Sequence, residues 1–166
     1  MKKIYLIRHA KAENSDDIKD FDRTLNGRGK EDAKFMAKRL RKYGIFPDII
    51  YTSPAKRALK TTKILADFLE YDKKKIVSLE RLYESSLRDY LDVITQTSDA
   101  HESLFLVAHN PTITEVGEYL SGAILTSIPT SAIVCICFDV DSFKEIGEES
   151  GDVLFFDYPK KHKAKI

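Results

Sequence analysis

The chain has 166 residues, of which 43% are hydrophobic and 32% charged, a balance typical of a globular rather than a disordered protein. Basic residues number 27 and acidic residues 26, so the net charge of +1 gives no global field that would favour nucleic acid. No apolar run approaches the roughly 20 residues of a membrane span, and we find no signal peptide. These features predict a single domain, residues 1–166, that lies in the cytoplasm and binds neither membrane nor nucleic acid.

Strand-like and helix-like stretches alternate along the chain. Strands are expected at residues 4–8, 48–53, 75–79, 104–109, 131–138 and 153–158. Several of these stretches are apolar without alternation, which suits a sheet covered on both faces. The order predicts a three-layer α/β fold with a mainly parallel sheet and an antiparallel edge near the C-terminus.

The first predicted strand, with the sequence IYLIR, ends abruptly at Arg8 and His9. Two potentially cationic side chains at the end of an apolar strand suggest an anion site. A strand that simply surfaces into water is the alternative interpretation of this pair alone. The irregular segment that follows, residues 13–29, contains several aspartates but lacks the spacing of an EF-hand, so we interpret it as a solvated loop.

Polar residues predict where the helices begin and end. Asn26, Ser53 (before Pro54), Ser86 (with Asp89) and Asn110 (before Pro111) are expected at helix starts, and Gly122 is expected as a C-terminal cap.

Three strand ends carry residues that could bind an anion. Arg8 and His9 follow the first strand, Arg57 falls in the first turn of the helix after the second, and His109 lies just before another helix start. Ligands of open α/β sheets bind at the carboxyl ends of the strands, and helix N-termini favour anions. A cation in the first turn of a helix is itself unfavourable unless an anion joins it. Together the three strand ends therefore predict a phosphate site.

The segments LIRHAKAE, TSPAKRALKTT and LFLVAHNPTITE together resemble the histidine phosphatase superfamily, which has a phosphoglycerate mutase-like fold. The short chain, the segment DRTLNGRGKEDA, the LYE motif and the final VLFFDYP resemble its phosphohistidine phosphatase (SixA-like) branch. The resemblance implies that His9 is the nucleophile that accepts the phosphoryl group. It further implies that Arg8 and Arg57 clamp the phosphate, that His109 donates to the phosphoryl oxygens, and that neither metal nor cofactor takes part.

The chemistry of these residue types supports the implied roles. A neutral imidazole is nucleophilic near pH 7, and neighbouring arginines favour its uncharged form. Guanidinium groups supply the positioning and charge stabilisation that phosphoryl transfer needs. The sequence departs from the family pattern at Ala10, where the commoner motif has Gly, and at Ser15, where some relatives carry a phosphate-binding Asn.

The remaining candidate site residues are less well defined by the sequence. Glu84 is the first candidate for the proton donor and Glu80 the second, with a loop carboxylate near a helix start as the plain alternative for Glu84. Asn110 and Ser131 are expected to contact substrate, although Thr130 and Ser131 also fit ordinary strand-start positions. The lysines of the C-terminal tail are interpreted as a solvated terminus, with an acidic partner as the alternative: Lys160, Lys161, Lys163 and Lys165.

The two cysteines, Cys135 and Cys137, are interpreted as buried apolar residues. They lie two apart on a strand, so they cannot readily form a disulfide, and they have no zinc-ligand spacing. Free thiols fit a reducing compartment.

The expected function is a metal-independent phosphatase that acts on protein phosphohistidine. Alternatives are a small-molecule phosphomonoesterase or mutase of the same superfamily, a non-catalytic phosphate-binding module, and a metal-dependent hydrolase that uses His9 and His109. The expected partner is accordingly a phosphorylated protein or a small phosphorylated compound.

Overall fold

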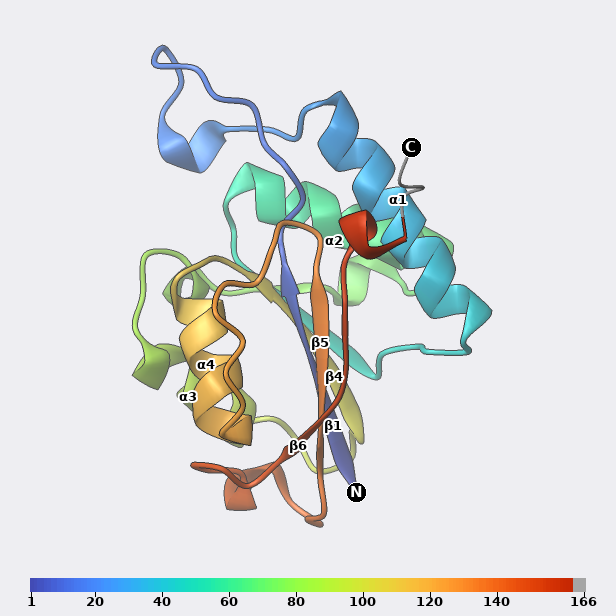
Figure 1. The fold of residues 1–166 in the computed structure, drawn as a ribbon, viewed down its shortest axis with the longest axis vertical. Coiled ribbons are helices and arrows are strands. Elements are labelled where there is room, and N and C mark those ends of the chain that lie inside the picture. Colours follow the sequence, from blue (N-terminus) through green and yellow to red (C-terminus); the bar gives the residue numbers. More distant parts are fainter. Residues whose placement is uncertain (163–166) are drawn as a thin grey trace.

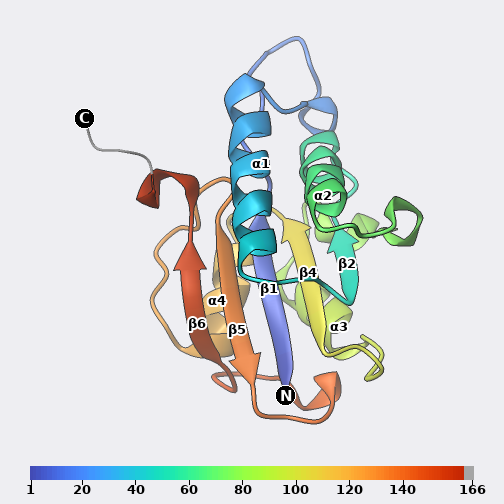
Figure 2. The ribbon, with the colours of Figure 1, turned by 90° about the vertical axis from the view of Figure 1, so that its right-hand side faces the viewer.

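The computed structural model describes residues 1–162, which form one mixed sheet covered by helices on both faces (Figures 1 and 2). In sheet order the strands of this part of the chain are β3 (Val77–Ser78), β2 (Ile49–Thr52), β4 (Ser103–Ala108), β1 (Lys2–Arg8), β5 (Ile133–Phe138) and β6 (Asp152–Asp157). Strands β3, β2, β4 and β1 are parallel, whereas β5 is antiparallel to both β1 and β6. The predicted mainly parallel sheet is confirmed, with the antiparallel strand one position in from the edge.

The helices divide into two layers. Helices α1 (Gly27–Lys42) and α2 (Lys56–Phe68) cover one face, and α3 (Leu87–Thr95) and α4 (Thr112–Ser121) cover the other (Figure 2). The described residues also form short 3₁₀ helices: η1 (Asp20–Asp22), η2 (Lys73–Lys75), η3 (Glu80–Leu82), η4 (Phe143–Glu145) and η5 (Pro159–Lys161). None of the helices within residues 1–162 has the length and apolar character to cross a bilayer.

Strand β1 shows why the sheet needs both layers. Ile4 and Leu6 pack into the core beneath α3 and α4, while Tyr5 and Ile7 pack into the core beneath α1 and α2. Successive side chains of a strand point to opposite faces, so a strand apolar at every position requires cover on both. The unbroken apolar run of the sequence is thereby explained.

The carboxyl ends of the central strands meet at one edge of the sheet. Arg8 is opposite Ala108 in the register of β1 and β4, and Thr52 is opposite Val107 in that of β2 and β4. The residues that follow these strands, including His9 and His109, are therefore brought to the same edge.

Three of the predicted helix caps are confirmed. The Asn26 side chain accepts a 2.7 Å hydrogen bond from the Gly29 amide, Ser86 forms a capping box with Asp89, and Gly122 ends α4 in a left-handed conformation with φ 73°. A left-handed residue at a helix end favours glycine because it has no Cβ.

The other two predicted caps are wrong. Neither Ser53 nor Asn110 caps a helix, because the residues before α2 and α4 are Ala55 and Pro111, which make no side-chain capping bond. The Ser53 hydroxyl does accept from the Ala55 amide, but it also bonds to His109. Both side chains lie instead at the edge of the sheet where the three strand ends meet.

Of the two cysteines, Cys135 is buried, whereas Cys137 is only half-buried, and both are free thiols. The prediction of burial is therefore correct for the first and incomplete for the second. Lys163 and Lys165 of the basic tail lie outside the described residues.

Gly29 lies where α1 passes the backbone just after His9. A Cβ at this position would lie 2.0 Å from the Lys11 carbonyl oxygen, whereas a Cβ at Gly27, two residues earlier, would meet nothing within 4 Å. We expect Gly29→Ala to lower the free energy of unfolding by about 1–3 kcal/mol, because backbone must move to relieve the overlap. Denaturant unfolding of Gly29→Ala beside Gly27→Ala tests this, and equal stabilities of the two variants would contradict it.

Candidate active site

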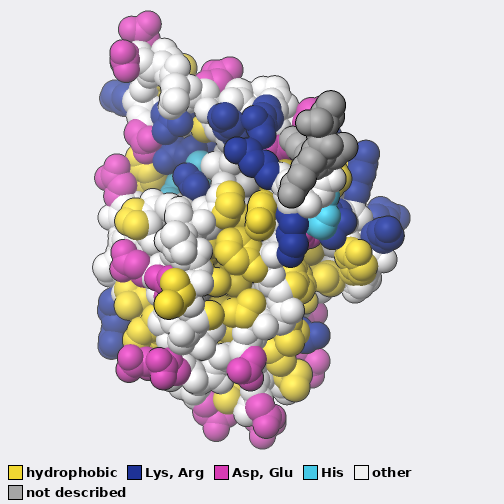
Figure 3. Space-filling view, in the orientation of Figure 1, with side chains coloured by type: hydrophobic (Ala, Val, Ile, Leu, Met, Phe, Trp, Pro, Cys, Tyr) yellow, Lys and Arg dark blue, Asp and Glu magenta, His cyan; other side chains and the backbone are white. Residues whose placement is uncertain are grey.

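The carboxyl edge of the sheet contains a pocket of about 300 Å³, which we call the His9 pocket. Its lining includes Arg8, His9, Arg57 and His109, so the structure brings together the four residues that the sequence places after three different strands. The space-filling view in Figure 3 shows lysine and arginine side chains gathered around histidine side chains in the upper part of the molecule.

His9 is held as a neutral imidazole with a defined tautomer. Its Nδ1 lies 2.7 Å from the Ala10 carbonyl oxygen, which can only accept, so Nδ1 carries the proton and Nε2 the lone pair. The side chain is buried, and burial lowers the pKa of His9 to about 3 despite the opposing bond to Ala10, while His109, Arg57 and Arg8 lower it further. A neutral imidazole with a free lone pair is the form that a nucleophile requires.

The two arginines of the His9 pocket present unused donors. Arg8 donates from Nη1 to the Ile128 carbonyl, and Arg57 donates from Nη1 to the Asp20 carbonyl. Within the described residues the Nε atoms of both guanidinium groups are buried and have no partner. Burial and the proximity of Arg57 lower the pKa of Arg8. Buried donors without partners are rare and costly. An anion bound between the two guanidinium groups would give these donors a hydrogen-bond partner.

His109 faces His9 across the pocket, with the ring centroids 5.1 Å apart. Its Nε2 lies 2.6 Å from the Ser53 hydroxyl and its Nδ1 lies 3.5 Å from Arg57. Burial, followed by the charge of Arg57, lowers the pKa of His109 to about 4. Arg57 can only donate, so Nδ1 accepts this contact, and Nε2 carries the proton and donates it to the Ser53 hydroxyl. Sequence reasoning assigned Ser53 only a capping role and missed this contact.

The pKa values of the two histidines can be tested directly by NMR. Because both rings are buried near arginines, they should stay neutral as the pH falls through 6.5, the usual histidine pKa, and should titrate at about 3 for His9 and 4 for His109. The unfolded chain binds these protons near pH 6.5, so both rings make the free energy of unfolding fall as the pH drops below that value. A His9 ring that titrates at its ordinary value would contradict the buried, neutral nucleophile.

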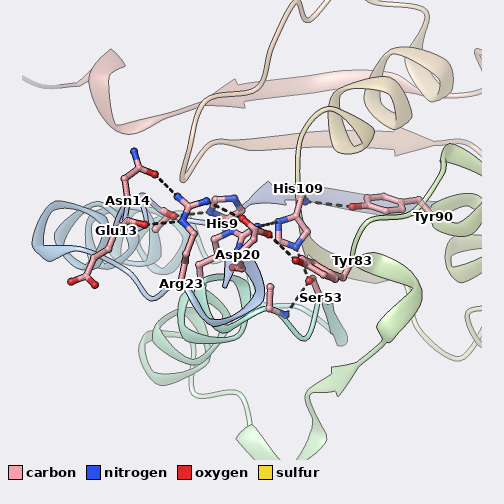
Figure 4. Close-up of polar contacts among 12 residues, drawn as sticks. His9, Glu13, Asn14, Asp20, Arg23, Ser53, Tyr83, Tyr90 and His109 are labelled. Atoms are coloured by element: carbon pink, nitrogen blue, oxygen red, sulfur yellow. Dashed lines mark hydrogen bonds and ion pairs between the residues drawn. The ribbon is translucent and has the colours of Figure 1, made fainter. Parts of the chain in front are cut away.

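Residues 13–20 are exposed, as the interpretation of a solvated loop predicts, but Asp20 also reaches the site. The Asp20 carboxylate accepts hydrogen bonds from Arg57 Nη2 at 3.0 Å and from the Tyr83 hydroxyl at 2.7 Å. Arg23 fixes the same carboxylate from the other side and also binds the loop itself (Figure 4). The acidic residues of this segment gave no signal that one of them would reach the phosphate site, because that contact depends on how the whole loop folds.

At two places the residue that lines the His9 pocket is a neighbour of the residue that the sequence suggested. Asn14 lines the His9 pocket, whereas Ser15, which we compared with the phosphate-binding Asn of some relatives, is exposed and outside the lining. Thr130 lines the pocket rather than Ser131, whose buried hydroxyl has no partner among the described residues. The Ser131 amide instead bonds to the carbonyls of Arg8 and His9 at the end of β1.

Asn110 lies in the wall of the pocket, but its amide is engaged elsewhere. It donates to the Ile128 carbonyl at 2.8 Å and to Ser127, and it accepts from Thr114 at 2.6 Å. These bonds hold the segment before β5, which also supplies the carbonyl that binds Arg8. We therefore expect Asn110 to support the site through this segment as well as to line it.

A second hollow of about 870 Å³ adjoins the His9 pocket, and we call it the Tyr83 groove. The groove shares Arg57, His109 and Asn110 with the pocket. Glu84 lines the groove and is exposed, whereas Glu80 lies outside it. Of the two predicted proton donors, Glu84 is therefore the one that lines a hollow next to the His9 pocket. Within residues 1–162 no three His, Cys, Asp or Glu side chains are grouped so as to hold a metal ion.

The described chain is thus an α/β protein whose sheet has, at its carboxyl edge, a pocket lined by two histidines and two arginines. A sequence model described as the histidine phosphatase superfamily (branch 1) matches residues 4–120. The match covers most of the chain, including all four residues of the His9 pocket that the sequence predicted. The chain belongs to this superfamily.

Two solved structures with similar folds are described as SixA proteins. A candidate phosphohistidine phosphatase SixA from Agrobacterium tumefaciens has a TM-score of 0.82 and 27% identity, with 95% of this chain and 98% of that chain covered. The protein histidine phosphatase SixA complexed with tungstate also has a TM-score of 0.82, at 21% identity over 97% and 99% of the two chains. The SixA-like fold expected from the sequence is confirmed.

Two curated relatives share only part of their length with this chain. A candidate phosphoserine phosphatase 2 from Hydrogenobacter thermophilus is 36% identical over 110 residues, 64% of this chain and 52% of that protein. The mitochondrial serine/threonine-protein phosphatase Pgam5 of Drosophila willistoni is 38% identical over 85 residues, 50% of this chain and 28% of that protein. The match with this chain therefore spans about half of the length of the first relative and less of the second.

Proposed function

We propose that this protein is a phosphatase that passes a phosphoryl group through His9, and that its substrate is phosphohistidine in a protein. The observation that carries the proposal is the neutral His9 ring in a pocket where two arginines keep buried, unpartnered Nε donors. A pocket that only bound phosphate would need the arginines but not a histidine held with its lone pair free.

The first chemical step follows from this geometry. The Nε2 lone pair of His9 attacks phosphorus, the bond to the leaving group breaks, and that bond's electron pair departs with the leaving group. Arg8 and Arg57 stabilise the charge on the equatorial oxygens through their guanidinium groups. His109 donates to the same oxygens from Nδ1 once the Ser53 hydroxyl donates to Nε2, which moves the ring proton to Nδ1. The positive charge that develops on His9 is stabilised by the bond from Nδ1 to the Ala10 carbonyl.

In the second step water attacks the phosphorus and the new P–N bond breaks, which returns neutral His9 and releases phosphate. The residues of this chain provide the same oxygen contacts in both steps. The protein therefore needs one set of donors for formation and breakdown of the intermediate.

Two observations support a phosphohistidine in a protein as the substrate. The Tyr83 groove, of about 870 Å³, opens beside the His9 pocket and has room for more of a substrate than its phosphoryl group. The related solved structures named for SixA are described as phosphohistidine or protein histidine phosphatases, whereas a curated relative is named for phosphoserine. We also propose the cytoplasm, the compartment expected from the sequence, as the place of the reaction.

Glu84 separates this substrate from phosphate esters. An alkoxide needs a proton as it departs, whereas an imidazole leaves through a nitrogen that is readily protonated. Glu84→Gln should therefore slow hydrolysis of phosphoserine and similar esters by about 10²–10⁴-fold and slow phosphohistidine hydrolysis far less. The measurement is kcat/KM on both substrates for the variant and the wild type.

Glu80→Gln is the matched control, because it makes the same change outside the Tyr83 groove. Equal losses on both substrates in Glu84→Gln would recast Glu84 as a structural residue. Ester hydrolysis that far exceeds phosphohistidine hydrolysis in the wild type would overturn the proposed substrate.

A further inference from the structure

Asp20 places a fixed negative charge at the boundary between the His9 pocket and the Tyr83 groove. Its Oδ2 accepts from Arg57 and Tyr83, and its Oδ1 accepts from Arg23 at 3.1 Å. Figure 4 shows the carboxylate between Arg23 on one side and Tyr83 and His109 on the other. An otherwise half-exposed loop residue is thus tied down by three side chains from three different parts of the chain.

The position of this carboxylate is unexpected for a phosphate site. Asp20 lines the Tyr83 groove but not the His9 pocket, and Arg57 lines both. Arg57 donates from Nη1 and Nη2 to Asp20, while its buried Nε has no hydrogen-bond partner among the described residues. A phosphoryl group bound to Nε would therefore have the Asp20 carboxylate on the far side of the same guanidinium, toward the groove.

The Asp20 carboxylate is suited to act as a permanent anion rather than as an acid. Partial burial opposes its ionisation, but hydrogen bonds from Tyr83, Arg23 and Arg57 prevail and lower the pKa of Asp20 to about 2. It is consequently ionised at neutral pH and has no proton to give to a departing alkoxide. Its remaining influence on a substrate is electrostatic.

We propose that Asp20 selects substrates by the charge that the group to be displaced carries in the Tyr83 groove before its bond to phosphorus breaks: it favours a cationic phosphoimidazole ring and disfavours groups that carry a carboxylate. The proposal rests on the proposed phosphatase function and assigns its specificity to one residue. A phosphorylated imidazole that is protonated on its second nitrogen is a cation, and a nearby carboxylate stabilises it. The same carboxylate repels an anionic leaving group.

The charge balance of the transfer is consistent with this role. The substrate ring carries phosphorus on one nitrogen and a proton on the other. When the P–N bond breaks, its electron pair stays on the ring, which leaves as neutral imidazole with the proton still on its second nitrogen. His9 Nε2 forms the new P–N bond and becomes the cationic ring. Asp20 accepts a hydrogen bond from the departing ring and gains no proton.

The test compares three substrates whose rings differ in charge before the bond to phosphorus breaks. The protonated ring of phosphohistidine is cationic, the ring of phenyl phosphate is the neutral reference, and the ring of 4-carboxyphenyl phosphate is anionic. For Asp20→Asn we expect kcat/KM on phosphohistidine, relative to phenyl phosphate, to fall about 10–100-fold. The ratio of carboxyphenyl to phenyl phosphate should rise by a similar factor.

Asp22→Asn is the matched control, because Asp22 lies in the same 3₁₀ turn, forms an ion pair with Lys56 at 3.5 Å and lines neither hollow. It should leave both ratios unchanged. If Asp20→Asn changes kcat/KM equally for all three substrates, Asp20 only holds the loop in place, and the proposal is overturned.

The result also separates the two proposals. A wild-type protein that does not cleave phosphohistidine would refute the proposed substrate, while the ratio of the two aryl phosphates would still test the charge of Asp20. Phosphohistidine cleavage with ratios that Asp20→Asn leaves unchanged would refute only the role of Asp20.

Discussion

His9→Ala should lower phosphatase turnover by about 10⁴-fold or more, because no other side chain in the His9 pocket presents a neutral, oriented lone pair to phosphorus. His109 cannot replace it readily, since its Nε2 is bonded to Ser53 and its Nδ1 faces Arg57. The measurement is steady-state turnover on phosphohistidine and on phenyl phosphate.

The fold of this variant should be retained, since His9 lies beyond the last residue of β1. Circular dichroism and the Tm should therefore change little while turnover disappears. His101→Ala is the control, because it removes a histidine that lines neither the His9 pocket nor the Tyr83 groove. Turnover of His9→Ala close to that of the wild type would exclude His9 as the nucleophile.

Arg57→Ala should raise the transition-state free energy by about 2–4 kcal/mol, a loss of about 10²–10³-fold in kcat/KM. The variant removes the buried Nε donor from the His9 pocket and releases Asp20 from two of its hydrogen bonds. Arg57→Lys should recover only part of the activity, because an ammonium group keeps the charge but not the forked geometry.

Lys56→Ala provides the comparison for this change, since Lys56 precedes Arg57 in the same helical turn and its exposed side chain pairs with Asp22. The Tm of Arg57→Ala should fall modestly, because the loop around Asp20 loses an anchor even though a cation leaves the helix N-terminus. If kcat/KM falls no further in Arg57→Ala than in Lys56→Ala, Arg57 does not contact the transferring group.

The sheet and the strand ends could be predicted because they depend on local patterns. The unbroken apolar run from Ile4 to Ile7 requires a sheet covered on both faces, and parallel strands bring their carboxyl ends to one edge. Arg8, His9, Arg57 and His109 follow from that rule alone. The superfamily match is consistent with it.

The rest of the site depends on contacts between distant segments that no local pattern encodes. Asp20 reaches Arg57 across 37 positions and Tyr83 across 63, and Ser53 reaches His109 across 56. Ser53 also shows how a local rule can mislead, because a serine before a proline is typical of a helix start. Here the hydroxyl orients a histidine of the site.

The most direct test of the account is to trap the intermediate on the enzyme. Protein mixed with a radiolabelled phosphohistidine substrate and quenched in alkali should carry label in a linkage that is stable to alkali and labile to acid, as a P–N bond is. Peptide mapping should place the label on His9, and His9→Ala should carry none. Label on another residue, or a wild type that turns over substrate without ever carrying label, would contradict transfer through His9.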